Sequence, residues 1–107
     1  MKVYLNRKNG VSAVGEFNLS DKSLIVKKGS IISTSISDSK KFRGTATIEK
    51  YRKEYADEDK VKKDVAFKSA STAANFVTGI STNGLIAWKD KDGKTLKMIM
   101  SEVDADE

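Results

Sequence analysis

The first third of the chain shows the period-two alternation of apolar and polar side chains that is typical of half-buried β-strands. Asn9-Gly10 lies between the first two such runs and favours a hairpin, because both central positions of a tight hairpin turn take positive φ. Leu24-Ile25-Val26 is a short continuous apolar run, and together with the alternating runs it predicts an antiparallel meander of about four strands, at residues 1–5, 11–19, 24–26 and 31–36.

Apolar residues spaced three and four apart predict helices in the rest of the chain. We expect a helix over 47–56, a charged loop over 57–64, a strand at 65–67, a helix capped by Ser69 or Ser71 and ended by Gly79, a strand at 85–88, and a last helix capped by Thr95. The predicted fold class is α+β: the N-terminal meander, then helix, strand, helix, strand and C-terminal helix, with the helices packed on one face of the sheet.

Charge divides the chain into a basic body and an acidic end. We expect a single small domain over residues 1–100 and an acidic, frayed tail over 101–107, which holds four acids and no base. The net charge of the whole chain is +5, and the remaining hundred residues hold 20 bases and 11 acids, a net +9. A body this basic suits a polyanionic partner, although lysine-rich surfaces also serve solubility alone; the sequence leaves both interpretations open.

The chain has no cysteine and no histidine. The absence of both residue types excludes disulfides, thiolate nucleophiles and Ser-His or Cys-His arrangements. It also disfavours a zinc site, since cysteine and histidine are the usual zinc ligands. No apolar run approaches the length of a membrane span, and the first residues do not resemble a secretory signal. We therefore expect a cytoplasmic, non-catalytic protein without a cofactor or a membrane partner.

Two acidic motifs resemble parts of known metal-binding motifs. Asp90-Lys91-Asp92-Gly93 resembles part of a calcium loop, but the EF-hand spacing would require carboxylates where the chain has Trp88 and Ile99, so we interpret it as a turn. Glu58-Asp59-Lys60 has the order of a nuclease motif but lacks apolar neighbours that would mark a rigid strand. A metal-dependent enzyme that uses Asp57, Glu58, Asp59 or Asp64 therefore ranks below a nucleic-acid-binding module and a protein-interaction module.

Candidate nucleic-acid contacts come from cations and from one polar turn. Lysine and arginine side chains could bind phosphate, polar side chains could reach bases, and an exposed aromatic ring could stack on one. Phe42 among its basic neighbours and Trp88 are such rings, yet packing in the core is the stronger interpretation for both. The candidate residues are Lys40, Lys41, Arg43, Lys68, Ser81, Thr82, Asn83, Trp88 and Lys89.

Three segments carry a family resemblance: DVAFKSASTAANFVTG at 64–79, STNG at 81–84 and WKDKDGKTL at 88–96. They resemble a prokaryotic domain of unknown function, DUF4357, which often follows nuclease domains of the GIY-YIG type. Where that family commonly has arginine and an aromatic residue, this chain has Ile80 and Leu85.

The resemblance implies an accessory nucleic-acid-binding module from a restriction-like setting, with DNA favoured and with catalysis left to a separate nuclease or methylase partner. This is an association and not a mechanism. A protein-interaction or scaffold module remains the alternative, using a sheet edge or the helix that carries Tyr51 and Tyr55.

Overall fold

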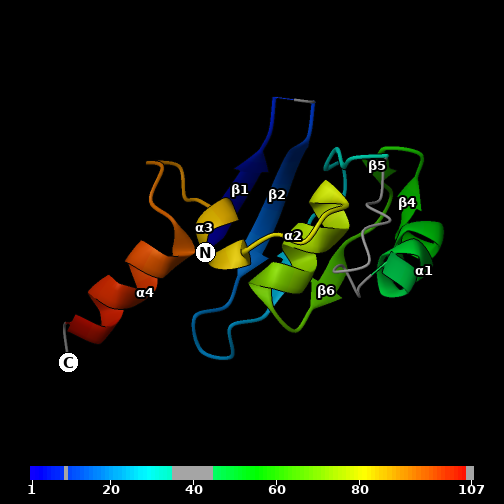
Figure 1. The fold of residues 1–107 in the computed structure, drawn as a ribbon. Coiled ribbons are helices and arrows are strands. Elements are labelled where there is room, and N and C mark those ends of the chain that lie inside the picture. Colours follow the sequence, from blue (N-terminus) through cyan, green and yellow to red (C-terminus); the bar gives the residue numbers. More distant parts are fainter. Residues whose placement is uncertain (9, 35–44, 106–107) are drawn as a thin grey trace.

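A computed structural model describes residues 1–8, 10–34 and 45–105 (Figure 1). Its main sheet has four antiparallel strands in the order β1-β2-β3-β6. The strands are β1 (Lys2–Asn6), β2 (Ser12–Phe17), β3 (Leu24–Val26) and β6 (Val65–Phe67). The α+β class and the antiparallel four-stranded sheet are confirmed.

The β1–β2 hairpin forms where the sequence predicts it. Gly10 has a φ of 98°, a conformation that glycine adopts without the penalty of a Cβ. The amide of Arg7 donates to the carbonyl of Val11 at 2.9 Å and closes the turn. Asn9 lies outside the described residues.

The fourth strand of the sheet is not the predicted one. The free edge of β3 is taken by β6, which pairs Val65 with Val26 and Phe67 with Leu24 and so buries two large side chains. Ile31 makes only isolated bridges, to Ser12 and Lys60. Residues 32–34 of the predicted strand form no strand, and residues 35 and 36 lie outside the described residues.

Four helices and a second, two-stranded sheet complete the described chain. They are α1 (Thr45–Tyr55), α2 (Ala70–Thr78), α3 (Gly84–Ala87), α4 (Leu96–Ala105), β4 (Ala56–Asp57) and β5 (Lys60–Val61). The helices predicted at 47–56, after Ser69 and after Thr95 are confirmed. Because α4 continues to residue 105, helical structure extends into the acidic segment, and fraying of residues 101–107 stays a prediction.

Two local predictions were wrong. The charged segment 57–64, expected to be a loop, contains the β4–β5 hairpin, which buries Val61 against the core. The segment 85–88, expected to be a strand, begins as the short helix α3, because Asn83 accepts a hydrogen bond from the Leu85 amide and caps a helical turn instead of a hairpin.

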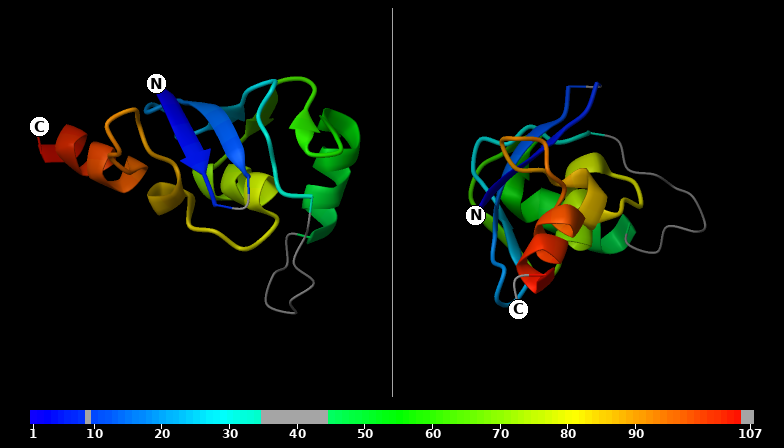
Figure 2. Two further views of the ribbon diagram at one scale, coloured as in Figure 1. Left: turned by 90° about the horizontal axis from the view of Figure 1, so that it is seen from above. Right: turned by 90° about the vertical axis from the view of Figure 1, so that its left-hand side faces the viewer.

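The core lies between the sheet and α2. Figure 2 shows α2 against one face of the sheet, and Val3, Leu5 and Phe17 from the strands point into the same cluster as Phe76 and Val77 from the helix. The helix begins and ends as predicted: Ser69 Oγ accepts from the Thr72 amide at 3.1 Å, and Gly79 has a φ of 76°. The opposite face of the sheet carries no helix in the described part of the chain.

Helix α1 packs against the end of α2. Nε and Nη2 of Arg52 donate to the carbonyl of Phe76 at 3.2 and 2.9 Å, near the C-terminus of α2 where a cation is favoured. Partial burial lowers the pKa of Arg52 but leaves the guanidinium protonated near neutral pH. Tyr51 contacts Phe67 with 5.0 Å between ring centroids, so the predicted apolar stripe of this helix faces inward.

The turn that precedes β6 is tied to the turn that follows β3 by a carboxylate, and this contact makes stability dependent on pH. Asp64 accepts from the Lys28 amide at 2.8 Å and from Lys27 Nζ at 2.9 Å, and these bonds hold the pKa of Asp64 below its ordinary value of 3.8. A carboxyl with a depressed pKa stabilises the fold above its unfolded pKa, and the stabilisation is lost as pH falls through the folded one.

We therefore expect Asp64→Asn to be less stable than the wild type at pH 7, with the difference shrinking as pH falls below about 4. Urea denaturation at pH 7, 4 and 2.5 would measure it. Asp59→Asn is the control, because the Asp59 carboxylate has no partner among the described residues. A difference that does not change with pH would contradict the assignment.

Candidate functional site

A groove runs along the outer edge of β1, between this strand and the segment 82–93. It consists of two adjoining hollows of about 490 and 270 Å³, which share Asn6, Ala87 and Lys89. We call it the β1 groove. Its lining residues are Tyr4, Asn6, Arg7, Thr82, Asn83, Ile86, Ala87, Lys89, Asp90, Lys91 and Gly93.

Backbone pairing places Tyr4 and Lys89 side by side. The Tyr4 amide donates to the Lys89 carbonyl at 2.7 Å, and the Lys89 amide donates back at 3.0 Å. Directly opposed residues of an antiparallel pair point to the same face. Because Val3 and Leu5 are buried in the core, Tyr4 and Lys89 lie on the face of the sheet that α2 does not cover.

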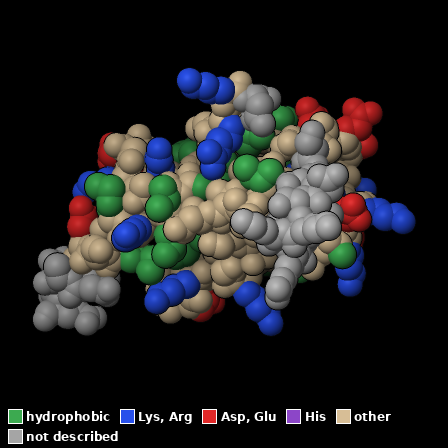
Figure 3. Space-filling view, in the orientation of Figure 1, with side chains coloured by type: hydrophobic (Ala, Val, Ile, Leu, Met, Phe, Trp, Pro, Cys, Tyr) green, Lys and Arg blue, Asp and Glu red, His purple; other side chains and the backbone are tan. Residues whose placement is uncertain are grey.

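The groove carries a positive charge that the described residues do not neutralise. Arg7, Lys89 and Lys91 are exposed, and none of the three forms an ion pair within the described ranges. On the face drawn in Figure 3, basic side chains lie near the tip of the β1–β2 hairpin, beside exposed hydrophobic ones. The single acid in the lining, Asp90, leaves the local balance positive.

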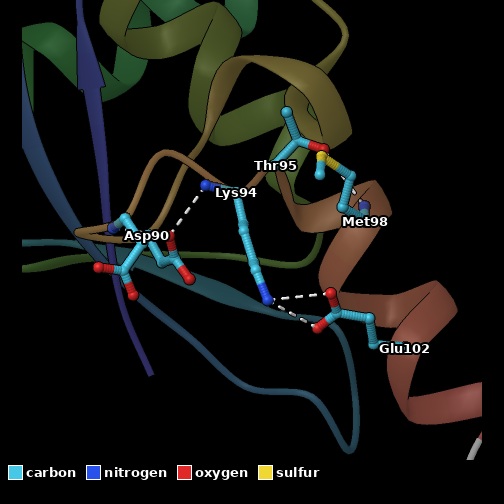
Figure 4. Close-up of polar contacts among 6 residues, drawn as sticks. Asp90, Lys94, Thr95, Met98 and Glu102 are labelled. Carbon is cyan, nitrogen blue, oxygen red and sulfur yellow. Dashed lines mark hydrogen bonds and ion pairs between the residues drawn. The ribbon is translucent and has the colours of Figure 1, made fainter.

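Hydrogen bonds fix the wall of the groove formed by residues 90–94 (Figure 4). Asp90 Oδ1 accepts from the amides of Asp92 and Lys94, each at 2.9 Å, so this carboxylate shapes the turn. Lys94 Nζ reaches Glu102 of α4 at 3.0 Å, and Thr95 Oγ1 accepts from the Met98 amide at 3.2 Å. The turn is thereby anchored to α4, and Lys91 at its tip stays exposed.

The polar turn that precedes α3 lines the smaller of the two hollows. The Thr82 amide donates to Asn75 Oδ1 at 2.8 Å, and the Thr82 hydroxyl donates to the Ile80 carbonyl at 3.0 Å. Asn83 Oδ1 accepts from the Leu85 amide at 3.1 Å. The Thr82 hydroxyl therefore supports the turn, while Asn83 Nδ2 has no partner among the described residues and remains available to a ligand.

The structure brings only some of the predicted contact residues together. Thr82, Asn83 and Lys89 line the β1 groove, and Ser81 is an exposed neighbour of Thr82. Lys68 is exposed but lines neither hollow. Lys40, Lys41 and Arg43 lie outside the described residues, so their predicted phosphate contacts stay predictions.

Trp88 requires a correction. Its side chain is 0% exposed, and its Nε1 donates to the Ala70 carbonyl at 3.0 Å. A ring in this position has no free face on which a base could stack, so the proposed platform role of Trp88 is wrong. The other interpretation, a large side chain that fills the core, is confirmed.

Sequence reasoning missed eight of the eleven lining residues, among them the aromatic, amide and basic side chains of Tyr4, Asn6, Arg7 and Lys91. Alternation along β1 contained part of the signal, since Tyr4 and Asn6 fall on the face opposite Val3 and Leu5. The missing information was the bridge between Tyr4 and Lys89, which joins residues far apart in the chain.

The acidic candidates do not gather into a metal site within the ranges that the structure describes. The Asp64 carboxylate accepts hydrogen bonds from Lys27 and Lys28. Glu58 lies in the turn of the β4–β5 hairpin and has a φ of 56°. In the same described ranges, no helix combines the length and the apolar content of a membrane span.

Comparison with protein families identifies the wider relationship. A family model described as Domain of unknown function (DUF4357) matches residues 3–100. The chain belongs to this family. The resemblance seen in the sequence is thus confirmed, and the match includes all of the residues that line the groove. No curated protein and no solved structure matches the chain.

Within this DUF4357 chain, the segments that carried the resemblance build the frame behind the groove. Ser69 caps α2, Ser71 Oγ accepts from the Gly84 amide at 3.0 Å, and Trp88 binds the first carbonyl of α2. Two residues of this chain differ from those that the family commonly has: Ile80 is half-exposed, and Leu85 packs against the core.

Proposed function

We propose that this protein is a non-catalytic, cytoplasmic nucleic-acid-binding module that holds a phosphate backbone in the β1 groove. The observation that carries the proposal is the set of three cations without an ion pair in the described residues, Arg7, Lys89 and Lys91, along the two adjoining hollows of the β1 groove. A cation without an acidic partner can bind phosphate without first breaking an ion pair.

Phosphate binding is favoured here by geometry as well as by charge. Arg7 borders one hollow, Lys91 borders the other, and Lys89 borders both, so the cations follow the groove. Binding to such a row releases the counterions that surround a nucleic acid, a sequence-independent source of affinity. The family resemblance alone favours DNA over RNA as the partner. It also favours a separate nuclease or methylase that supplies catalysis.

The test is the binding of labelled single- and double-stranded DNA and RNA, measured by fluorescence anisotropy across a salt series. For the variant Arg7→Gln/Lys89→Gln/Lys91→Gln we expect at least tenfold weaker binding at low salt. We also expect the slope of log K against log salt to shrink by about 2 to 3, since each lost phosphate contact removes about 0.7 to 0.9.

A matched control separates the groove from net charge. Lys50→Gln/Lys53→Gln/Lys62→Gln removes the same charge from exposed positions on α1 and next to β5, which line neither hollow. This variant should keep most of the affinity. Equal losses in the two variants would contradict a groove-based site, and no binding by the wild type at low salt would refute the proposed function.

A protein-interaction role is the second candidate. A hollow of about 340 Å³ on α1, lined by Thr47, Lys50, Tyr51, Glu54 and Tyr55, favours it. A protein that co-purifies with the wild type and equally with the groove variant would support this role.

A further inference from the structure

We propose that the β1 groove binds a single-stranded segment, with one base stacked on the ring of Tyr4; this inference rests on the proposed function. Tyr4 is half-buried, lines the larger hollow and lies on the sheet face opposite the core. It is the only aromatic side chain in the described lining of either hollow.

The surroundings of Tyr4 suit a base with its phosphates. Lys89 is its direct partner across the bridge, and Arg7 follows on the same chain segment where β1 ends. An aromatic ring on an open sheet face, flanked by cations, supports single strands by stacking one base while the cations bind the adjoining phosphates.

The elements around the groove suit a single strand better than a duplex. In a duplex the faces of the bases are covered by their neighbours, so Tyr4 would have no base to stack on. Reading the major groove takes an inserted helix or a two-stranded ribbon. Among the described elements, the helix that lines the hollows is α3, which has four residues. The strand that lines them, β1, belongs to a four-stranded sheet and not to a separate two-stranded ribbon.

Two amides can contact the edges of an unstacked base. Asn6 lines both hollows, and Asn83 Nδ2 adds a hydrogen-bond donor in the smaller one. Amide side chains offer donors and acceptors to the Watson–Crick edge, which only an unpaired base exposes. The larger hollow, at about 490 Å³, falls within the roughly 300–1,000 Å³ typical of small-ligand sites.

The experiment compares three probes of equal length and charge per strand at one salt concentration: a thymidine single strand, the same strand with abasic residues, and a duplex. We expect the wild type to prefer the thymidine strand over the abasic one about tenfold, because only the thymidine strand offers bases that can stack on the ring. Tyr4→Leu should remove this preference, because the thymidine strand then loses the ring on which its base stacks.

Tyr4→Phe is the matched variant, since it keeps the ring and loses only the hydroxyl. It should retain the preference within about threefold, and thermal melting would verify that both variants fold. Equal binding of thymidine and abasic strands by the wild type, or a preference that survives Tyr4→Leu, would overturn base stacking on Tyr4. Tighter binding of the duplex than of the single strand would overturn the single-stranded ligand. In these cases loss of binding in the charge variant of the groove would still support the proposed function.

Discussion

The variant Gly84→Ala is expected to lose most of the folding free energy of the protein. A Cβ at this position would overlap the carbonyl carbon and oxygen of Ala70 and the amide nitrogen of Ser71. These are backbone atoms in the first turn of α2, so no rotamer change relieves the overlap. Either α3 or α2 must move, and the Trp88 contact with the Ala70 carbonyl moves with them.

We expect a cost above about 4 kcal/mol, which is exceptional for one methyl group and would leave little of the roughly 5–15 kcal/mol typical of a small domain. Urea denaturation followed by the fluorescence of the single tryptophan would measure it. Gly15→Ala is the matched control, because its Cβ would meet side-chain and not backbone atoms, those of Leu24 and Trp88 at 2.9 and 3.2 Å. It should cost about 1–3 kcal/mol, in the usual range for overpacking. Equal stabilities of the two variants would contradict the close approach of α3 to α2.

Local signals in the sequence predicted most of the individual elements. Period-two alternation located β1 and β2, and a short continuous apolar run located β3. The capping residues Ser69 and Thr95 were found because caps act over three or four residues. The prediction failed where partners are distant in the chain. Nothing local distinguishes residues 31–36 from 65–67 as the neighbour of β3, and pairing with β6 depends on a helix and a hairpin in between.

The Asn83-Gly84 pair shows how one local signal supports two structures. The dipeptide is typical of hairpin turns, and the apolar residues after it suggested a strand. Here Asn83 caps a helix, and Gly84 is required for contact with α2 and not for a positive φ. Packing decided between the two structures, and packing is not visible in a window of a few residues.

The candidate site was predictable only in part for the same reason. Lys89 and the polar turn at 81–83 were found from composition, but their value as a site depends on the bridge between Lys89 and Tyr4. That bridge converts the outer edge of β1 into one side of a groove. Trp88 was also a candidate stacking platform, because the sequence does not show whether the ring of a tryptophan beside a lysine is exposed or buried.

Trp88→Phe should separate stability from binding. The change removes the hydrogen bond from Nε1 to Ala70 and leaves a void in a fully buried site, so we expect a loss of about 2–3 kcal/mol, less than the 3–5 kcal/mol of truncation to alanine. The Ala70 carbonyl sits in the first turn of α2, where the intrahelical ladder also uses it, which limits the penalty. The single-strand affinity should stay within about threefold of the wild type, because a ring that is 0% exposed touches no ligand.

The same residue provides a readout that does not depend on any variant. Trp88 is the only tryptophan, so the fluorescence of the wild type reports its environment directly. A buried indole should resist quenching by iodide in the folded protein and become accessible in urea. Binding of a single strand should leave that emission nearly unchanged, whereas a platform role would quench it strongly. Strong quenching on binding would show that Trp88 contacts the ligand, as would a Trp88→Phe variant with native stability and lost affinity. Either result would contradict Tyr4 as the ring on which the base stacks.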